Sequence, residues 1–397
     1  MRVLVTASAR FAITPDGILC TPSASLTHRF WSRYLDVYDE VQLMVRAKPV
    51  ASVPEGWAVS SGPGVTPVPL PYYEGPWQYV KTRRSIVQAI RGVVTRAEAI
   101  HFRLPCSIGS LAWGARDHGH PYGVEVVTDP YDVFAPKAVR HPLRRFFRWY
   151  FPWHLRRQVA NATAVAYVTQ YSLQQRYPAA AGAFTTGYSS IELGDEAFVS
   201  EARPERSGDG PFTLVFVGSL AQLYKAPDVL IDAVGQCVSQ GLDVRLMMVG
   251  DGKYRPQLEA QAARLGLNGH VTFTGEVPGG GAVREKLDQA DLFVLPSQVE
   301  GLPRAMVEAM ARALPCIGTH VGGIPELLAP EDIVRPGDAH ALADRIADVA
   351  RNPARQAEMS ARNLAKAREY HDSVLRQRRK AFYGYVREQT EQWLSAR

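Results

Sequence analysis

Short, nearly continuous apolar runs alternate along the chain with longer segments whose apolar positions have helical spacing. The apolar runs predict buried strands at residues 2–8, 41–45, 123–127, 164–169, 212–219, 244–250, 271–275 and 291–297. Near-continuous apolar strands between helices are typical of parallel sheets that are covered on both faces. The pattern therefore predicts an α/β protein with two doubly wound, Rossmann-like halves.

A polar segment rich in proline and glycine, residues 201–211, is the best linker candidate between the halves. We expect one Rossmann-like domain over residues 1–200 and a second over residues 212–375. The amphipathic, basic residues 376–397 predict a helix that either closes the second domain or returns to the first. Ligands of doubly wound sheets bind beyond the carboxyl ends of the strands, so the cleft between the halves is the expected site.

The composition is that of an ordinary globular protein, with 397 residues, 46% of them hydrophobic and 21% charged. No apolar run approaches the roughly 20 residues that span a bilayer, and the N-terminal sequence lacks the apolar core of a signal peptide. We therefore expect a cytoplasmic protein. The cysteines are scattered and fit free thiols better than disulfides or a zinc site; they are Cys20, Cys106, Cys237 and Cys316.

Two glutamates, Glu300 and Glu308, lie eight positions apart at the end of the strand predicted over residues 291–297. Pro303 favours a helix start, which places Glu300 in the strand-to-helix turn and Glu308 on the helix. The free amides near a helix start favour an anion, and Gly301 lets a ligand approach the backbone closely. This arrangement predicts an anion site with two carboxylates beside it.

Both glutamates also have purely structural explanations. Arg304, Glu308 and Arg312 are spaced by four positions and could form a solvated stripe on the helix. Glu300 could equally be a carboxylate that complements the helix dipole. The spacing alone decides nothing, because about one such pair is expected by chance in a chain of this length and composition.

A second strand, turn and helix occupies residues 216–234, with Lys225 in the loop at the carboxyl end of the strand. An ammonium group there could hold a phosphate as a point charge, or it could be an ordinary solvated lysine. Three further segments, 244–252, 273–281 and 318–328, place glycines at strand ends, and each alone is typical of a plain turn.

In this order, the segments resemble the family 4 glycosyltransferases of the GT-B fold. The matching segments are FVGSL…YKAPDVLIDAV, VGDG, VTFTGEVP, PSQVEGLPRAMVEAMARALPCIGT, VGGIPELL and IVRPGDAHALADRI. The resemblance is dense over residues 212–350 and thin over the first half. It implies a retaining transfer of a sugar from a nucleotide-activated donor to an acceptor hydroxyl, with the acceptor on the first domain and the donor on the second.

The resemblance also implies roles for individual residues. Glu300 corresponds to the glutamate that contacts the donor sugar, and Lys225 to the lysine that neutralises the diphosphate. The amides of Gly301 and Leu302 correspond to those that meet the sugar or the diphosphate, and Glu308 to the residue that binds the ribose. The remaining donor-side positions are the backbone of Val277, near the base, and the loop residues Gly218 and Ser219.

The expected leaving group is a nucleoside diphosphate, whose negative charge grows as the glycosidic bond breaks. Many transferases neutralise this charge with a metal ion held by an Asp-x-Asp pair, and the chain contains no such triplet. Lys225 and the helix start at residues 301–303 can serve instead. We therefore predict no required metal and no cofactor besides the nucleoside-diphosphate sugar, which acts as co-substrate.

The chain departs from the family pattern at several positions. Ser219 stands where the family commonly has an arginine, so a second cation for the phosphates is missing or comes from elsewhere. Thr128 stands where a histidine is expected near the sugar. Asp129, the candidate catalytic carboxylate of the first half, either binds substrate hydroxyls or starts the turn before Pro130. His101 is better explained as a structural histidine.

Residues 137–158 are rich in arginine and aromatic side chains, and the first 200 residues carry 21 Lys and Arg against 14 Asp and Glu. Pro142 can open a helix whose arginines Arg144, Arg145 and Arg148 point away from an apolar face. The predicted apolar face consists of Leu143, Phe146, Phe147 and Tyr150. Such a helix can lie on an anionic membrane, or it can pack on the first domain with solvated arginines. No nucleic-acid recognition motif accompanies the charge.

Together these features predict a retaining glycosyltransferase of polysaccharide, glycolipid or glycoconjugate synthesis with a carbohydrate or lipid-linked acceptor. It would be cytoplasmic, with peripheral contact to an anionic membrane as an option. Two alternatives stay open: a catalytically silent GT-B subunit that binds a nucleotide sugar or a partner chain, and a nucleotide-sugar epimerase.

Overall fold

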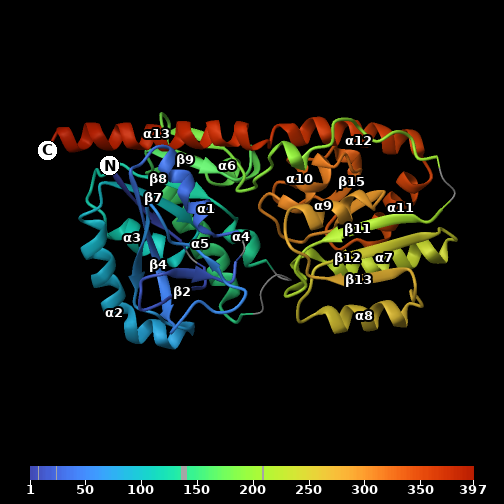
Figure 1. The fold of residues 1–397 in the computed structure, drawn as a ribbon, viewed down its shortest axis with the longest axis horizontal. Helices are drawn as coiled ribbons and strands as arrows, with labels where there is room; N and C mark the ends of the chain where they lie inside the picture. Colours follow the sequence, from blue (N-terminus) through green and yellow to red (C-terminus); the bar gives the residue numbers. More distant parts are fainter. Residues whose placement is uncertain (8, 24, 136–140, 208–209) are drawn as a thin grey trace.

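The protein is described by a computed structural model with two α/β halves that lie side by side (Figure 1). The N-terminal half contains a ten-stranded sheet and the C-terminal half a six-stranded sheet. The residues described are 1–7, 9–23, 25–135, 141–207 and 210–397. Within them, the predicted α/β class with two doubly wound sheets is confirmed, and each of the eight predicted strands is present.

The N-terminal sheet has the order β10-β9-β8-β7-β1-β4-β2-β3-β5, with β6 paired to β4. All pairs from β10 to β4 are parallel, as expected for strands with buried, near-continuous apolar runs. The strands are β1 (Arg2–Thr6), β2 (Phe11–Ile13), β3 (Leu19–Thr21), β4 (Glu40–Pro49), β5 (Ala58–Val59), β6 (Val65–Leu70), β7 (Ala99–Leu104), β8 (Gly123–Val126), β9 (Ala164–Tyr167) and β10 (Phe184–Gly187).

The C-terminal sheet has the order β13-β12-β11-β14-β15-β16, and its neighbouring strands are parallel. Its strands are β11 (Phe212–Val217), β12 (Val244–Val249), β13 (Val271–Gly275), β14 (Leu292–Leu295), β15 (Cys316–Thr319) and β16 (Ile333–Val334). The order changes direction at β11 and β14, which lie next to each other at the centre of the sheet. A ligand of this half is therefore expected at the carboxyl ends of those two strands.

Helices cover both sheets. Those of the N-terminal half are α1 (His28–Trp31), η1 (Ser32–Asp36), α2 (Gly75–Val94), α3 (Ser107–Ala115), α4 (Pro130–Val133), α5 (Arg144–Ala160), α6 (Ser172–Arg176) and η2 (Asp195–Ala197). Those after it are η3 (Leu223–Lys225), α7 (Pro227–Ser239), α8 (Arg255–Arg264), α9 (Gly281–Asp288), α10 (Arg304–Ala311), η4 (Ile324–Glu326), η5 (Pro330–Asp332), α11 (Ala339–Ala350), α12 (Pro353–Arg368) and α13 (Asp372–Ser395). None of the described helices is both long and apolar enough to cross a bilayer.

The last helix, α13, returns to the N-terminal half, which is one of the two arrangements expected for the C-terminal helix (Figure 1). It packs on β7, β8, β9 and β10 and buries Leu375, Phe382 and Val386. The helix begins at Asp372, four residues before the boundary expected at residue 376. The division of the chain at residues 200, 211 and 375 stays a prediction.

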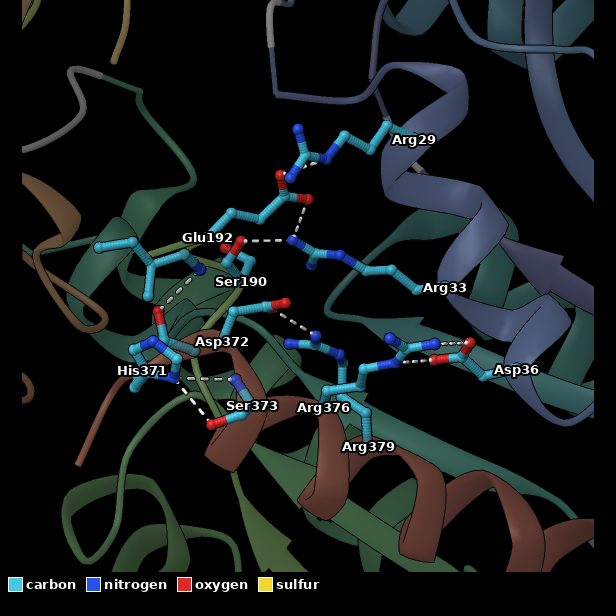
Figure 2. A network of polar contacts seen from close by, with 12 residues as sticks. Arg29, Arg33, Asp36, Ser190, Glu192, His371, Asp372, Ser373, Arg376 and Arg379 are labelled. Atoms are coloured by element: carbon cyan, nitrogen blue, oxygen red, sulfur yellow. Dashed lines mark hydrogen bonds and ion pairs between the residues drawn. The ribbon is translucent and has the colours of Figure 1, made fainter. Parts of the chain in front are cut away.

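The segments that cross between the halves are fastened to each other and to the N-terminal half. The amide of Asp372 donates to the carbonyl of Leu193 at 2.8 Å. Figure 2 shows Arg376 of α13 forming two hydrogen bonds, of 2.8 and 2.6 Å, with the carboxylate of Asp36 at the end of η1. The start of α13 is therefore held in place by both the outgoing segment and the first half.

A further contact joins the halves at their sheets. The carboxylate of Glu326, on η4, accepts hydrogen bonds from three consecutive amides at the start of α6, those of Gln170, Tyr171 and Ser172. The last two bonds measure 3.0 and 2.7 Å. A carboxylate at a helix start satisfies amides that have no partner within the helix. We call this contact the Glu326 clasp.

Candidate active site

The turn after β14 carries the first glutamate of the predicted pair. Lys225 Nζ donates to Glu300 Oε1 at 2.7 Å, and the hydroxyl of Ser297 donates to the same oxygen at 2.9 Å. The two charged side chains are only 14% and 9% exposed. The predicted proximity of Lys225 to the helix start after β14 is thus present, although 75 positions separate Lys225 from Glu300.

The backbone around Lys225 is shaped to bring the lysine to this turn. The lysine ends η3, and the next residue, Ala226, has a left-handed φ of 51° before α7 begins. A side chain at Gly218 would place its Cβ only 2.6 Å from Lys225 Cδ. Gly218, at the end of β11, is therefore needed to leave the path of the lysine side chain open.

Gly301 marks the place where the two halves touch. A Cβ at this position would lie 3.3 Å from the carbonyl oxygen of Val127 and 3.5 Å from a methyl group of Val168. Val127 and Val168 follow β8 and β9, so the carboxyl ends of strands from both sheets meet here. The predicted cleft therefore has Glu300 and Gly301 at its contact point.

A hollow of about 260 Å³ lies beside Glu300 and draws its lining from both halves. We call it the Glu300 hollow, and its lining residues are Thr128, Val133, Gln222, Tyr224, Val299, Glu300 and Gly301. Thr128, which stands where the family resemblance predicts a histidine, faces this hollow directly. Its hydroxyl can donate and accept hydrogen bonds, but it cannot carry a proton as an imidazole would.

Glu308 is half-buried on α10, one turn after Arg304. Burial raises the pKa of its carboxyl, and the positive charges of Arg304 and Arg284 partly oppose that rise. Arg312, the third member of the proposed solvated stripe, instead binds Asp288 at 2.7 and 2.8 Å. These contacts do not fit a common solvated face, and the ribose-binding role of Glu308 stays a prediction.

The two other donor-side positions are less constrained. Ser219 is exposed, and its hydroxyl accepts a hydrogen bond from the amide of Ala221 at 3.2 Å. Val277 is half-buried in the loop after β13. Their predicted roles at the phosphates and at the base stay predictions. Among the described residues, no group of three or more His, Cys, Asp or Glu side chains is placed to hold a metal ion.

Asp129 caps the N-terminus of α4 and is buried within the first half. Its carboxylate accepts from the amide of Tyr131 at 2.8 Å, pairs with Arg176 and accepts from the hydroxyl of Tyr177. All of its partners are thus internal. The geometry favours the turn-starting alternative for Asp129 over contact with substrate hydroxyls.

His101 lies fully buried on β7 among aromatic rings, which supports its structural interpretation. Its Nε2 lies 2.9 Å from the hydroxyl of Tyr38, which itself donates to the carbonyl of Tyr383. Burial lowers the pKa of His101 to about 3. The imidazole is therefore neutral at physiological pH and belongs to the contact between the sheet and α13.

The basic, aromatic segment forms helix α5, which begins at Arg144 rather than at Pro142. Two of the predicted outward arginines turn toward α4 instead: Arg144 donates to the carbonyl of Phe134, and Arg148 donates to that of Tyr131. Only Arg145 of the three is exposed. Residues 137–140 of the predicted segment lie outside the described residues.

The predicted apolar face of α5 was partly wrong. Of the four residues predicted for this face, Phe147 and Tyr150 are half-buried, while Leu143 and Phe146 are 55% and 49% exposed. Trp149 and Trp153 of the same helix are also exposed. The difference arises because the buried side of α5 is set by Pro152, Leu155 and Val159 later in the helix, a register that the first turns alone do not reveal.

The sequence analysis missed a buried charged cluster below the cleft. Arg103 on β7 and Glu125 on β8 are register partners and form a salt bridge. Glu125 also accepts from the hydroxyl of Tyr34, and Tyr383 lies 3.4 Å from it. The available signal was a single charged residue inside each of two apolar runs, HFRL and VEVV. The Glu326 clasp was missed as well, since no local pattern marks it.

Comparisons with known proteins agree with this geometry. Residues 200–367 match the family described as glycosyl transferases group 1. Protein CapJ of Staphylococcus aureus is 25% identical over 82% of this chain and 81% of its own length. The putative colanic acid biosynthesis glycosyltransferase WcaL of Escherichia coli is 34% identical over 36% of this chain and 37% of its own length.

Two solved structures share the fold over their entire length. Sucrose-phosphate synthase of Thermosynechococcus elongatus superposes with a TM-score of 0.68 at 18% identity, and 100% of both chains is covered. Anabaena HepE in complex with UDP and glucose superposes with a TM-score of 0.60 at 17% identity, again with 100% of both chains covered. At these identities the likeness concerns the fold.

Two doubly wound sheets that meet at the carboxyl ends of their strands have the arrangement of the GT-B fold. The match to the glycosyl transferases group 1 covers residues 200–367, which include most of the C-terminal half with its sheet and α10.

Proposed function

We propose that the chain transfers a sugar, with retention of configuration, from a nucleoside-diphosphate sugar to an acceptor hydroxyl in the interdomain cleft. The observation that carries the proposal is the buried Lys225–Glu300 pair, whose carboxylate lines the Glu300 hollow together with Gly301. The donor would lie on residues 212–375 and the acceptor on residues 1–200. HepE supports a nucleotide donor, since its structure contains UDP and glucose.

The chain's own groups suit this chemistry. Bond cleavage places growing negative charge on the leaving diphosphate, and preorganised donors stabilise such charge most strongly where water is excluded. Lys225 and the amides of Gly301 and Leu302 would supply those donors without a metal. Glu300 would orient the sugar and Glu308 the ribose. Attack from the face that the leaving group vacates gives retention without a second carboxylate nucleophile.

A panel of UDP-, GDP-, ADP- and TDP-sugars tests the donor. A true donor raises Tm in proportion to the logarithm of its concentration over Kd. Slow hydrolysis of that donor without acceptor, unaffected by EDTA, is the expected activity. Glu300→Ala should lower this turnover far more than nucleotide affinity, and Glu308→Ala should weaken nucleotide affinity itself. Equal, negligible effects of both variants would contradict the assignment.

The acceptor would be a carbohydrate or a lipid-linked glycan of polysaccharide or glycolipid synthesis. The name of WcaL places it in colanic acid biosynthesis, which supports a polysaccharide acceptor. The name of a similar mannosyltransferase of Corynebacterium glutamicum gives its acceptor as a phosphatidylinositol monomannoside, which supports a glycolipid acceptor. The test is transfer of labelled sugar from the donor found above to glycan and glycolipid fractions.

We further propose that the enzyme is cytoplasmic and touches an anionic membrane surface through α5. The exposed rings of Phe146, Trp149 and Trp153 and the exposed Arg145 and Arg157 support this contact. Aromatic rings suit the lipid–water boundary, and each basic residue near an anionic surface contributes about 1 kcal/mol.

Flotation with phosphatidylglycerol vesicles should recover the protein, and neutral phosphatidylcholine vesicles should not. Arg145→Glu with Arg157→Glu should abolish flotation, whereas Arg264→Glu on α8 is the matched control. If the double variant and the Arg264→Glu control were recovered equally with phosphatidylglycerol vesicles, the proposed membrane contact would be contradicted.

The alternatives of a silent subunit and an epimerase remain distinguishable by product. A silent subunit would show a nucleotide-sugar Tm shift and no turnover. An epimerase would change the sugar of the donor in the absence of any acceptor. Ser219 and Thr128 motivate the first alternative, and the Lys225–Glu300 pair argues against it.

A further inference from the structure

The cation expected at the diphosphate is already engaged by an acidic group. Lys225 is the only Lys or Arg in the loop over residues 218–226. Its ammonium group lies 2.7 Å from Glu300 Oε1 and is largely buried with it. A paired lysine neutralises an incoming diphosphate less effectively than a free one, so a second cation is required near Gly301.

A second hollow of about 260 Å³ shares Gly301 with the Glu300 hollow. We call it the Arg304 hollow, and its lining residues are Ser25, Leu26, Phe30, Arg103, Val127, Val168, Ser189, Ser190, Gly301, Leu302 and Arg304. Two of these residues are arginines, of which Arg103 is paired with Glu125, and none is acidic. The second arginine, Arg304, therefore makes the lining favourable for an anion.

Arg304, the first residue of α10, is the cation of this hollow that forms no salt bridge, and its charge acts on the Glu308 carboxyl one turn later. Its side chain is exposed, and it forms no ion pair or hydrogen bond with any residue in the described part of the chain. Arg312, two turns later on α10, is by contrast occupied by Asp288. An arginine kept free at a hollow is available for a ligand, and its planar fork matches two phosphate oxygens.

Backbone donors at the same place are also free. Neither the amide of Gly301 nor that of Leu302 donates a hydrogen bond to another described residue. Both residues line the Arg304 hollow, next to the arginine. Glu308, which would bind the ribose, lies one turn beyond Arg304 on the same helix. A diphosphate bound to Arg304 would thus connect the sugar at Glu300 to the ribose at Glu308.

A small adjoining cavity, which Glu125 also lines, brings a further arginine close to the Arg304 hollow. This cavity of about 20 Å³ adjoins the Arg304 hollow, since Phe30, Arg103 and Ser190 line both. Arg379 of α13 also lines this cavity; it is 4% exposed, and its Nη1 has no hydrogen-bond partner among the described residues. Figure 2 shows its other nitrogen, Nη2, bound to Asp372 at 2.9 Å.

We propose that Arg304 supplies the second cation for the diphosphate of the donor, so that the leaving phosphates lie in the Arg304 hollow between the guanidinium and the Gly301 and Leu302 amides. The assignment rests on the proposed function. It makes Arg304 a binding residue of this chain, at a position that compensates for the uncharged Ser219.

Binding by isothermal titration calorimetry tests the assignment with UDP, UMP and uridine, and in parallel with GDP, GMP and guanosine. Arg304→Gln should weaken the diphosphate of the preferred base about ten- to a hundredfold, the range for a lost hydrogen bond to a charged group. The same variant should change nucleoside affinity less than twofold. Arg304→Lys should restore part of the loss, because it keeps the charge but not the fork.

Arg264→Gln, an exposed arginine on α8 that lines neither hollow, is the matched control and should bind like the unaltered chain. The Tm of each variant without nucleotide confirms that it folds. Unchanged diphosphate affinity in Arg304→Gln would overturn the assignment, and so would an equal loss for diphosphate and nucleoside. If the unaltered chain bound neither of these diphosphates, the same series is repeated with ADP and TDP, and binding of none of the four would make the proposed function itself fail.

A titration with glucuronate and with glucose tests whether Arg304 binds the carboxylate of an acidic acceptor sugar instead of the donor diphosphate. Arg304→Gln should leave the affinity of both sugars unchanged if the hollow serves the donor. If Arg304→Gln weakened the affinity for glucuronate alone and left diphosphate affinity intact, the arginine would bind an acidic acceptor and the proposal would be overturned.

Discussion

Two buried ion pairs, one in each half, are almost indistinguishable by local criteria. In the Arg103–Glu125 pair the side chains are 14% and 5% exposed, and in the Lys225–Glu300 pair they are 14% and 9% exposed. Each carboxylate also accepts a hydrogen bond from a hydroxyl, Tyr34 in the first case and Ser297 in the second. Burial and pairing alone therefore do not separate a structural pair from one at a binding site.

The space beside each carboxylate separates them. Glu125 borders a cavity of about 20 Å³, which holds roughly one water molecule. Glu300 borders a hollow of about 260 Å³ lined by both halves. The first pair is closed by α13, whose Tyr383 stacks on Tyr34, whereas the second faces the cleft. On this comparison we expect the first pair to contribute stability, and the second fits the proposed ligand site.

Removal of the Glu125 charge should have the largest effect and should fall on stability. Glu125→Gln leaves Arg103 buried without a counter-ion, and breaking a buried pair costs about 3–5 kcal/mol of unfolding free energy. Urea denaturation measures the loss. Glu300→Gln is the matched variant, and we expect it to cost under about 1 kcal/mol because residue 300 lines a hollow of about 260 Å³, from which water can reach the altered pair. Similar losses in both variants would erase the distinction.

Removal of the Glu300 charge should instead fall on turnover. We expect Glu300→Gln to lower donor hydrolysis about a hundredfold, or ~2.7 kcal/mol, because the carboxylate that orients the sugar is lost. Nucleotide Kd should change less than threefold. The measurement compares kcat and Kd of the variant with those of Glu125→Gln under conditions where both are folded. If Glu125→Gln lowered kcat as much as Glu300→Gln does, the comparison between the two pairs would be contradicted.

His101, which packs against α13 in the same closed region, should make the unfolding free energy depend on pH. Its pKa is lowered by burial from 6.5 to about 3, so the unfolded chain binds a proton that the folded chain does not. Stability is therefore fully present above pH 6.5 and falls by about 1.4 kcal/mol per pH unit as the pH drops toward 3. His101→Phe removes this contribution. Chemical denaturation between pH 7.5 and about 5 should show a shallower slope for the variant, and parallel slopes would refute the expectation.

The Glu326 clasp should have the smallest effect. Glu326→Gln keeps the size of the side chain but loses the charge that the amides at the start of α6 bind, for an expected cost of about 1 kcal/mol. Because the clasp joins the halves, small-angle scattering should show a slightly larger radius of gyration in the variant. Glu331→Gln, an exposed glutamate on η5 in the same half, is the control. Identical scattering of the two variants would show that the clasp does not hold the halves together.

Local chemistry sufficed for much of the prediction. The apolar runs located eight strands because a parallel strand that is covered on both faces has consecutive apolar residues. The turn at Glu300 and the helix after it could be predicted because Gly301 and Pro303 constrain their own backbone. The loop of Lys225 was found for the same reason. The strands that were not predicted are β2, β3, β5, β6, β7, β10, β15 and β16. Of these, β2, β3 and β5 are too short to show a period.

The sequence by itself therefore determined the two-sheet α/β architecture and the elements that carry Glu300, Glu308 and Lys225, because propensity and periodicity act over a few neighbouring residues. Only the tertiary structure decided which charges meet. Lys225 reaches Glu300 across 75 positions, Glu326 reaches α6 across more than 150, and Asp129 is occupied by Arg176 from 47 positions away. Such pairings follow from how the sheets and α13 pack together, and charge–charge contact leaves no periodic trace in the chain.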